Sequence, residues 1–233
     1  MSRVLIIGDT HCPCMLPEYP DFLWDCYEAW DCDRVVHIGD LVDNCSLSFH
    51  LKKPQQKDPI REFEQAMEQV EVLTHYFPAV ELMIGNHDVL PYRWANEVGI
   101  PEEMMRDFGA IFNLPSKWTV HARYAQLEID GVIYQHGDRG RSSAALNAKD
   151  EFQSVVQGHH HSKAGIEFVA NRNHRVFGMQ VGCGADWKHH QQDYGVKYSR
   201  KPIVGCGIVI DGTSAYFEPM HCGEGEPHHR GDR

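Results

Sequence analysis

The sequence predicts an α/β protein that folds as a single domain. Its 233 residues suit one large domain and can bury an apolar core without disulfide bonds. Short runs of β-branched and other apolar residues recur along the chain, as is typical of buried strands in a sheet covered on both faces. Segments with apolar residues at helical spacing separate several of these runs.

Five of the apolar runs end in a cluster of polar residues. We expect strands at 3–8, 34–39, 79–85, 131–135 and 154–158. The polar clusters after them begin at Asp9, Asp40, Asn86, His136 and His159. Because ligands of such sheets bind beyond the carboxyl ends of the strands, one sheet could bring the five clusters together.

Two long segments between these strands are predicted to be helices. Residues 18–30 have a plausible amphipathic face, and residues 59–76 begin with Pro59, which suits the first turn of a helix. Residues 90–117 interrupt the alternation of strands and helices. We interpret them as an insertion near the site, with helical pieces at 91–97 and 101–112.

The last third of the chain is rich in predicted strands. They cover 117–121, 125–130, 166–170, 175–181, 203–210 and 214–219. The dipeptides Asp130-Gly131 and Asp211-Gly212 lie between strand patterns and predict hairpin turns. The tail 223–233 is predicted to be flexible, so the folded domain should span 1–222.

Composition limits the partners of the chain. Acidic residues exceed Lys and Arg by eleven, which disfavours broad electrostatic binding to nucleic acid. The 16 His residues are unusual and favour metal or acid–base chemistry. No signal peptide precedes the first strand, and no apolar run is long enough to span a membrane. We therefore expect a cytoplasmic protein with no membrane partner and no structural disulfides.

The polar clusters contain the ligand types of a transition-metal site. Asp9 and His11 offer a carboxylate and an imidazole two residues apart, on one face of an extended strand. Asp40 adds a second carboxylate and Asn86 an amide oxygen. The set is completed by His136, His159 and His161. Mixed imidazole and oxygen ligands suit Mn, Fe, Zn or Ni better than Ca or Mg.

The order of these motifs resembles the calcineurin-like metallophosphoesterase superfamily. The chain reads DTH at 9–11, GDLVDN at 39–44, GNHD at 85–88, HG at 136–137 and GHHH at 158–161. The resemblance implies a sandwich of two mixed β-sheets flanked by helices, with the strand-rich last third supplying the second sheet. It also implies two divalent transition-metal ions, with Mn²⁺ expected and Fe, Zn or Ni as alternatives. One ion would be held by Asp9, His11, Asp40 and His161, and the other by Asp40, Asn86, His136 and His159.

The resemblance further implies catalytic roles for His87 and Asp43. His87 would lie beside the ions and stabilise or protonate the leaving oxygen of the ester. Asp43 would orient His87, with Asp88 as the competing partner and a helix cap as the alternative role of Asp43. The implied reaction is hydrolysis of a phosphodiester or phosphomonoester by in-line attack of a hydroxide that bridges the ions. His160 is expected to point away from the metals.

Cations and aromatic residues near the predicted site favour a small nucleotide-like substrate. Arg139 and Arg141 follow His136, and Trp187 and Lys188 lie on a loop that also carries Arg200 and Lys201. An aromatic ring beside cations suits a nucleotide base. Solvated charges on a loop that merely covers the sheet are the alternative interpretation.

Three other functional classes fit the same motifs. A nuclease acting on DNA or RNA is the main alternative. A protein Ser/Thr phosphatase is less favoured, because Asn44 stands where that group has a phosphate-binding arginine. An inactive scaffold is disfavoured because every expected ligand is present.

Overall fold

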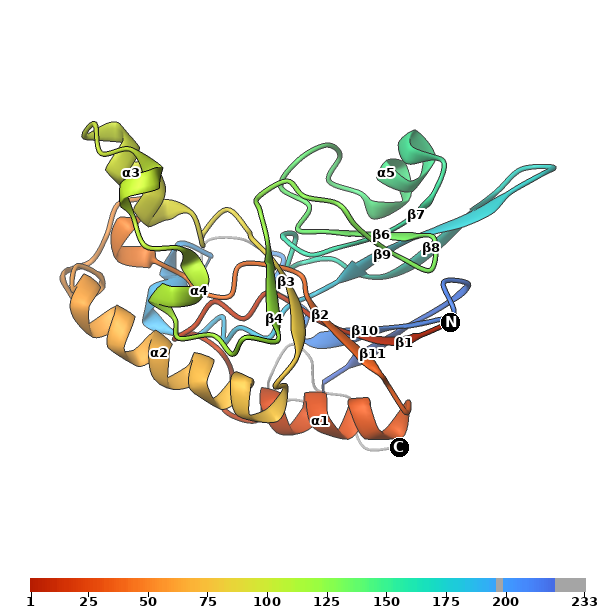
Figure 1. Ribbon diagram of the computed structural model, residues 1–233, viewed down its shortest axis with the longest axis horizontal. Coiled ribbons are helices and arrows are strands. Elements are labelled where there is room, and N and C mark those ends of the chain that lie inside the picture. Colours follow the sequence, from red (N-terminus) through yellow and green to blue (C-terminus); the bar gives the residue numbers. More distant parts are fainter. Residues whose placement is uncertain (196–198, 221–233) are drawn as a thin grey trace.

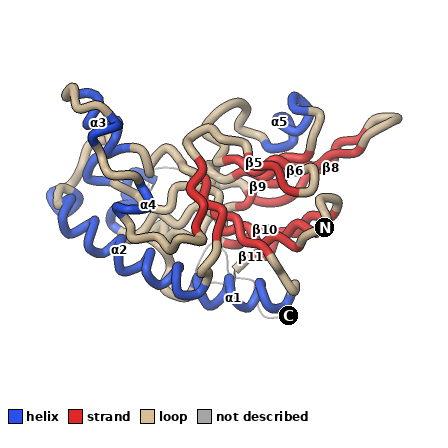
Figure 2. Tube along the Cα trace, in the orientation of Figure 1, coloured by secondary structure: helices blue, strands red, loops and turns tan. Residues whose placement is uncertain are grey.

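The computed structural model describes residues 1–195 and 199–220, which form four layers (Figures 1 and 2). Two β-sheets lie face to face. Helices α1 (Tyr19–Ala29) and α2 (Pro59–Tyr76) cover the outer face of the first sheet, and α5 (Ala144–Glu151) covers the second. This arrangement confirms the predicted sandwich of two sheets flanked by helices, but the strand-rich last third supplies strands to both sheets and not to the second alone.

Both sheets contain parallel and antiparallel pairs. The first has six strands in the order β11-β10-β1-β2-β3-β4. They are β1 (Arg3–Ile7), β2 (Arg34–His37), β3 (Val80–Met83), β4 (Trp118–His121), β10 (Gly205–Ile210) and β11 (Ser214–Pro219). The second has five strands in the order β5-β6-β7-β9-β8. They are β5 (Leu127–Ile129), β6 (Val132–Gln135), β7 (Ser154–Gln157), β8 (Ala164–Ala170) and β9 (Arg175–Val181).

Strand β1 is buried on both faces. Val4 and Ile6 pack in the cluster between the two sheets, whereas Leu5 and Ile7 pack toward α1 and α2. This division follows from the alternation of side chains along a strand. Each fully buried aliphatic side chain contributes roughly 1.5–3 kcal/mol to folding, so the end of β1, where Asp9 follows, is held firmly.

The two predicted long helices are confirmed. In α2, Asp58 caps the first turn by accepting a hydrogen bond from the Arg61 backbone N–H at 3.1 Å, and Pro59 occupies the first helical position. The helix ends at Tyr76, directly before β3. Its buried side chains pack against the first sheet together with those of α1.

The predicted insertion lies at one end of the molecule and is helical in short pieces (Figure 1). It contains α3 (Leu90–Glu97), the 3₁₀ turn η3 (Glu102–Met104) and α4 (Phe108–Ile111). The expected helix at 101–112 is therefore divided in two. Three further 3₁₀ turns are η1 (Cys45–Leu47), η2 (Pro54–Gln56) and η4 (His190–Gly195).

Helix α5 was missed by the sequence analysis because it has no large apolar face. Its buried residues are mostly alanines, and it lies directly on β9. A Cβ atom on Gly178 of β9 would stand 2.1 Å from the backbone nitrogen of Ala145. Helix and sheet thus meet backbone to backbone, and periodic patterns of large apolar residues cannot reveal such a contact.

Both predicted hairpins are present. Asp130 and Gly131 have φ values of 48° and 76° and form a two-residue turn between the antiparallel strands β5 and β6. Positive φ at both central positions is the mark of a type I′ turn. Asp211 and Gly212 begin the loop between β10 and β11.

Among the described residues, no helix combines the length and apolar character needed to cross a bilayer. No disulfide joins the seven cysteines in the same part of the chain. The predicted flexible tail at 223–233 lies outside the described residues.

Candidate metal centre

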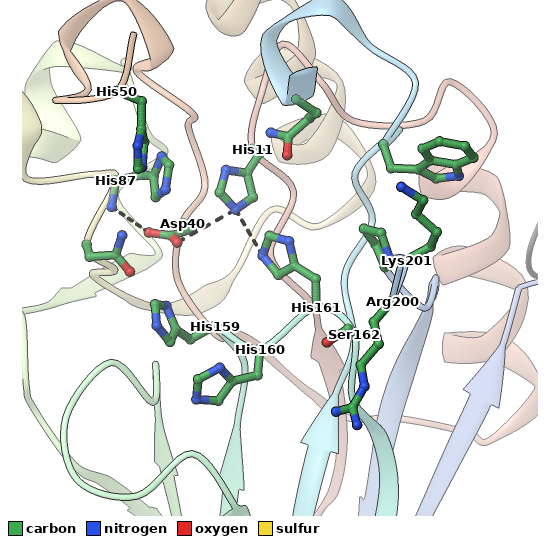
Figure 3. Close-up of a pocket in the computed structure, with 14 residues that line it drawn as sticks. His11, Asp40, His50, His87, His159, His160, His161, Ser162, Arg200 and Lys201 are labelled. Atoms are coloured by element: carbon green, nitrogen blue, oxygen red, sulfur yellow. Dashed lines mark hydrogen bonds and ion pairs between the residues drawn. The ribbon is translucent and has the colours of Figure 1, made fainter. Parts of the chain in front are cut away.

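Five loops converge where β1, β2, β3, β6 and β7 end (Figure 3). The seven residues predicted as metal ligands stand in these loops, and three overlapping clusters of potential ligand atoms form there. The clusters are Asp9–His11–His161, His11–Asp40–His87 and Asp40–His136–His159, each with ligand atoms within 4.8 Å of one another.

Asp9 and Asp40 are the two carboxylates of the centre, and both are buried. Asp9 Oδ2 accepts a hydrogen bond from the His159 backbone N–H at 2.9 Å and lies 3.0 Å from His161 Nε2. Asp40 Oδ2 lies 3.3 Å from His136 Nε2 and 3.6 Å from His11 Nε2. Asp40 therefore stands between the two groups of imidazoles.

Two of the imidazoles, those of His11 and His136, present Nε2 to the centre because their Nδ1 atoms are engaged elsewhere. His11 Nδ1 donates to Asp43 Oδ1 at 2.8 Å, and His136 Nδ1 donates to the Ile38 carbonyl at 3.1 Å. Such contacts fix the tautomer and the ring orientation of metal-binding histidines.

The donor atoms fit divalent cations. His11 Nε2 and His161 Nε2 face each other at 3.1 Å, beside Asp9 Oδ2. Three potential ligand atoms thus converge at one point. Asp9 Oδ1 is also buried and has no hydrogen-bond partner in the described part of the chain. An orphaned buried carboxylate oxygen is costly, and a bound cation removes that cost.

Backbone conformation also distinguishes the centre. His11, Asp40 and His159 adopt left-handed φ values of 48°, 49° and 62°. Non-glycine residues in that region cost about 1–3 kcal/mol each and cluster at functional sites. The residue before His159, Gly158, approaches Asp9 closely: a Cβ atom there would lie 2.2 Å from Asp9 Oδ1.

We predict that Gly158→Ala lowers the free energy of unfolding by about 1–3 kcal/mol, because the added methyl group must displace Asp9. Thermal unfolding and the number of bound Mn²⁺ equivalents would measure the effect. Gly109→Ala is the matched control, since its added Cβ meets no atom closer than 3.4 Å. Equal stability of the two variants would contradict this account of Gly158.

His87 and Asp43 lie together, but the shorter contact to His87 is made by the backbone carbonyl of Asp43 and not by its carboxylate. His87 Nδ1 donates to the Asp43 backbone carbonyl at 2.6 Å and lies 3.3 Å from Asp43 Oδ1. The Asp43 carboxylate is thus shared between His87 and His11. Burial lowers the pKa of His87, but the charges of Asp40 and Asp43 outweigh burial and raise it to about 10.

Asp88, the competing partner, does not bond to His87. Its carboxylate accepts hydrogen bonds from the backbone N–H groups of Gly85 at 2.8 Å and Val42 at 3.1 Å. Burial, with a smaller contribution from the Asp40 charge, raises the pKa of Asp88 to about 7. Asp88 ties two of the converging loops together.

Sequence reasoning missed several amides that hold the loops. Asn44 Nδ2 donates to the His87 carbonyl at 3.0 Å, and Gln192 Nε2 donates to Asp43 Oδ1 at 3.2 Å. Gln157 Nε2 donates to Gln180 Oε1 at 3.1 Å, and Gln180 in turn donates to the Gly158 carbonyl. A glutamine at the end of a buried strand, directly before a ligand loop, was the available signal for Gln157.

A cavity of about 410 Å³ opens over the centre (Figure 3). It is lined by His11, Asp40, His50, Asn86, His87, His159, His160, His161, Ser162, Trp187, Gln192, Arg200, Lys201 and Pro202. His160, expected to point away from the metals, lines this cavity too, and its ring packs 4.8 Å from that of His159. It belongs to none of the three ligand clusters.

Not all of the predicted substrate residues line this cavity. Trp187 lines the cavity, but Arg139, Arg141 and Lys188 are not among the described residues that do so. Arg141 pairs with Asp150 at 2.8 Å, and Arg139 borders a separate pocket of about 170 Å³. The loop after His136 leads to α5 on the outer face of the second sheet, and the pocket that Arg139 borders also includes His136.

The fold and the centre agree with the family comparison. The model of the calcineurin-like phosphoesterases matches residues 2–198, and the chain belongs to this family. No curated protein gives a significant match.

Three solved structures illustrate the range of similar chains. YfcE, a phosphoesterase from E. coli, has 13% identity over 88% of this chain and 87% of its own, with a TM-score of 0.40. Vacuolar protein sorting 29 from Cryptosporidium parvum has 14% identity over 94% and 97%, with a TM-score of 0.45. The nuclease MPE from Pseudomonas putida has 12% identity over 93% and 87%, with a TM-score of 0.30.

Proposed function

We propose that this protein is a hydrolase that cleaves a phosphate ester with the help of two divalent metal ions. The observation that carries the proposal is the pair of ligand clusters on either side of Asp40. Asp9, His11 and His161 form one cluster, and His136 and His159 stand with Asp40 in another. A shared carboxylate between two such groups suits a dinuclear centre, because an anion is needed between two dications.

The proposed ligands keep the division expected from the sequence. Asp9, His11, Asp40 and His161 would hold one ion, and Asp40, Asn86, His136 and His159 the other. The mixed nitrogen and oxygen donors favour Mn²⁺, with Fe, Zn or Ni as alternatives. When bound, the ions would lower the pKa of the attacking water and offset the negative charge of the phosphate.

His87 is proposed as the acid for the leaving group. Its Nδ1 is held by Asp43, so its Nε2 is left to face the cavity that the ring lines. Asp40 and Asp43 favour the protonated ring, which is the form that can donate a proton to a departing oxygen. Asp43 has a positioning role, since it holds both His87 and His11.

The size and charge of the cavity support a small phosphate ester such as a nucleotide. A volume of about 410 Å³ lies within the range of small-molecule sites. Asn44 binds the His87 backbone and does not offer a cation, which weakens the protein phosphatase alternative. The net charge of −11 disfavours long nucleic acids more than nucleotides.

A panel of substrates with added Mn²⁺ tests the proposal. We expect turnover of bis-p-nitrophenyl phosphate and of nucleotide phosphoesters, and little turnover of phosphopeptides or of double-stranded DNA. Efficient cleavage of DNA would favour the nuclease alternative. Absence of turnover on every substrate, with metal bound, would favour a scaffold.

A further inference from the structure

Trp187 holds two lysine side chains over its indole ring. The Lys201 ammonium lies 5.0 Å from the ring centroid and the Lys188 ammonium 5.7 Å. Cations at these distances are attracted to the ring face. The indole Nε1 is buried and has no hydrogen-bond partner among the described residues. The ring face therefore holds ammonium groups, a different task from stacking on a nucleobase.

Only one of these two lysines lines the cavity over the metal centre. Lys201 lines the cavity together with Arg200, whereas Lys188 does not. In Figure 3, Arg200 and Lys201 lie on one side of His161, and His87 lies on the other. The proposed leaving-group acid and the two cations therefore face different parts of a bound substrate.

The wall of the cavity has a charge opposite to that of the whole chain. Asp40 is the only carboxylate among the described residues that line it, and Asp40 is a proposed metal ligand. Arg200 and Lys201 add two positive charges in a protein whose net charge is −11. In Figure 3 the two side chains extend in different directions, with the Lys201 ammonium held over Trp187. An ammonium is suited to a phosphate group, because it binds phosphate oxygens through charge-assisted hydrogen bonds.

We propose that Lys201, held over Trp187, forms a subsite for a second phosphate group of the substrate. This proposal rests on the proposed function and narrows its substrate class. The substrate carries one phosphate that is cleaved at the metal centre and another on the part retained after cleavage, away from His87. A nucleoside with a phosphodiester on one hydroxyl and a phosphate on another carries these two groups.

A pair of chromogenic diesters tests the subsite. The probes are the p-nitrophenyl ester of thymidine 5′-phosphate and the same ester with an added 3′-phosphate. The wild-type protein should prefer the 3′-phosphorylated probe by roughly tenfold in kcat/KM, mainly through KM, as one charge-assisted contact provides. Lys201→Ala should abolish the preference, and Lys201→Arg should largely restore it.

Lys188→Ala is the matched control. Both lysines pack on the same indole, but only Lys201 lines the cavity, so Lys188→Ala should keep the full preference. Equal kcat/KM of the wild-type protein for the two probes would overturn the proposal. So would an equal loss on both probes in Lys201→Ala.

A binding measurement separates the subsite from the proposed function. Calorimetry with Mn²⁺-loaded protein would compare thymidine 3′,5′-bisphosphate with thymidine 5′-monophosphate. Tighter binding of the bisphosphate, lost in Lys201→Ala, would support the subsite even if neither chromogenic probe were cleaved. Equal affinity for the two ligands would reject the subsite even if both probes were hydrolysed.

Discussion

Replacing Asp40 by asparagine should remove both metal ions and nearly all hydrolysis. The wild-type protein is expected to bind close to two equivalents of Mn²⁺, measured by elemental analysis after desalting. Asp40 Oδ2 lies within 3.6 Å of both His11 Nε2 and His136 Nε2, so one carboxylate serves both proposed sites. Asparagine keeps the size and tolerates the φ of 49° but carries no charge to offset two dications. The loss in activity should exceed the roughly 10–100-fold typical of residues that only support a ligand.

Asp138→Asn is the control for this experiment. Asp138 is another shielded carboxylate, two residues after His136, but it pairs with Arg123 at 2.7 Å and belongs to no ligand cluster. It should retain two equivalents of Mn²⁺. A wild-type protein that binds a single equivalent in excess metal, or an Asp40→Asn variant that keeps one ion tightly, would contradict the shared-ligand arrangement.

Sequence patterns predicted the parts of the fold that depend on periodicity and local backbone chemistry. Strand β1 and helix α2 lie where apolar spacing placed them, and the Asp130-Gly131 turn follows from residues that accept positive φ. Helix α5 was not predicted, because it contacts β9 through alanines and the backbone beside Gly178. Contacts of that kind depend on two distant segments fitting together.

The proposed ligands lie together, but not on one sheet as the strand pattern suggested, because β1, β2 and β3 belong to the first sheet and β6 and β7 to the second. The carboxyl ends of the strands of both sheets meet at one end of the sandwich. Which partner each side chain takes was not predictable in the same way. The Asp43 carboxylate lies closer to His11 than to His87, and this depends on the path of a loop whose residues Asp40 and Asn44 are left-handed. The path of another loop, the one between β9 and β10, likewise decides that Lys201, and not Lys188, lines the cavity. No spacing rule encodes such choices.

His87→Gln should lower turnover by about 10²–10⁴, the usual contribution of a general acid, while two equivalents of Mn²⁺ stay bound. The metal measurement is decisive because His87 could itself be a ligand: its potential ligand atom lies within 4.8 Å of those of His11 and Asp40. Loss of an ion in the variant would make His87 a ligand and would remove its proposed role as an acid.

The size of the loss should depend on the leaving group. Cleavage of thymidylyl-(3′→5′)-thymidine releases a strongly basic sugar alkoxide, which needs a proton. Cleavage of the p-nitrophenyl ester of thymidine 5′-phosphate releases p-nitrophenolate, which is a weak base. The variant should therefore be impaired far more on the dinucleotide than on the p-nitrophenyl ester. His160→Gln is the matched control, since His160 lines the same cavity but stands outside the ligand clusters. It should leave the ratio of the two rates near the wild-type value, and an equal loss on both esters in His87→Gln would assign His87 to binding the phosphate instead of protonating the leaving oxygen.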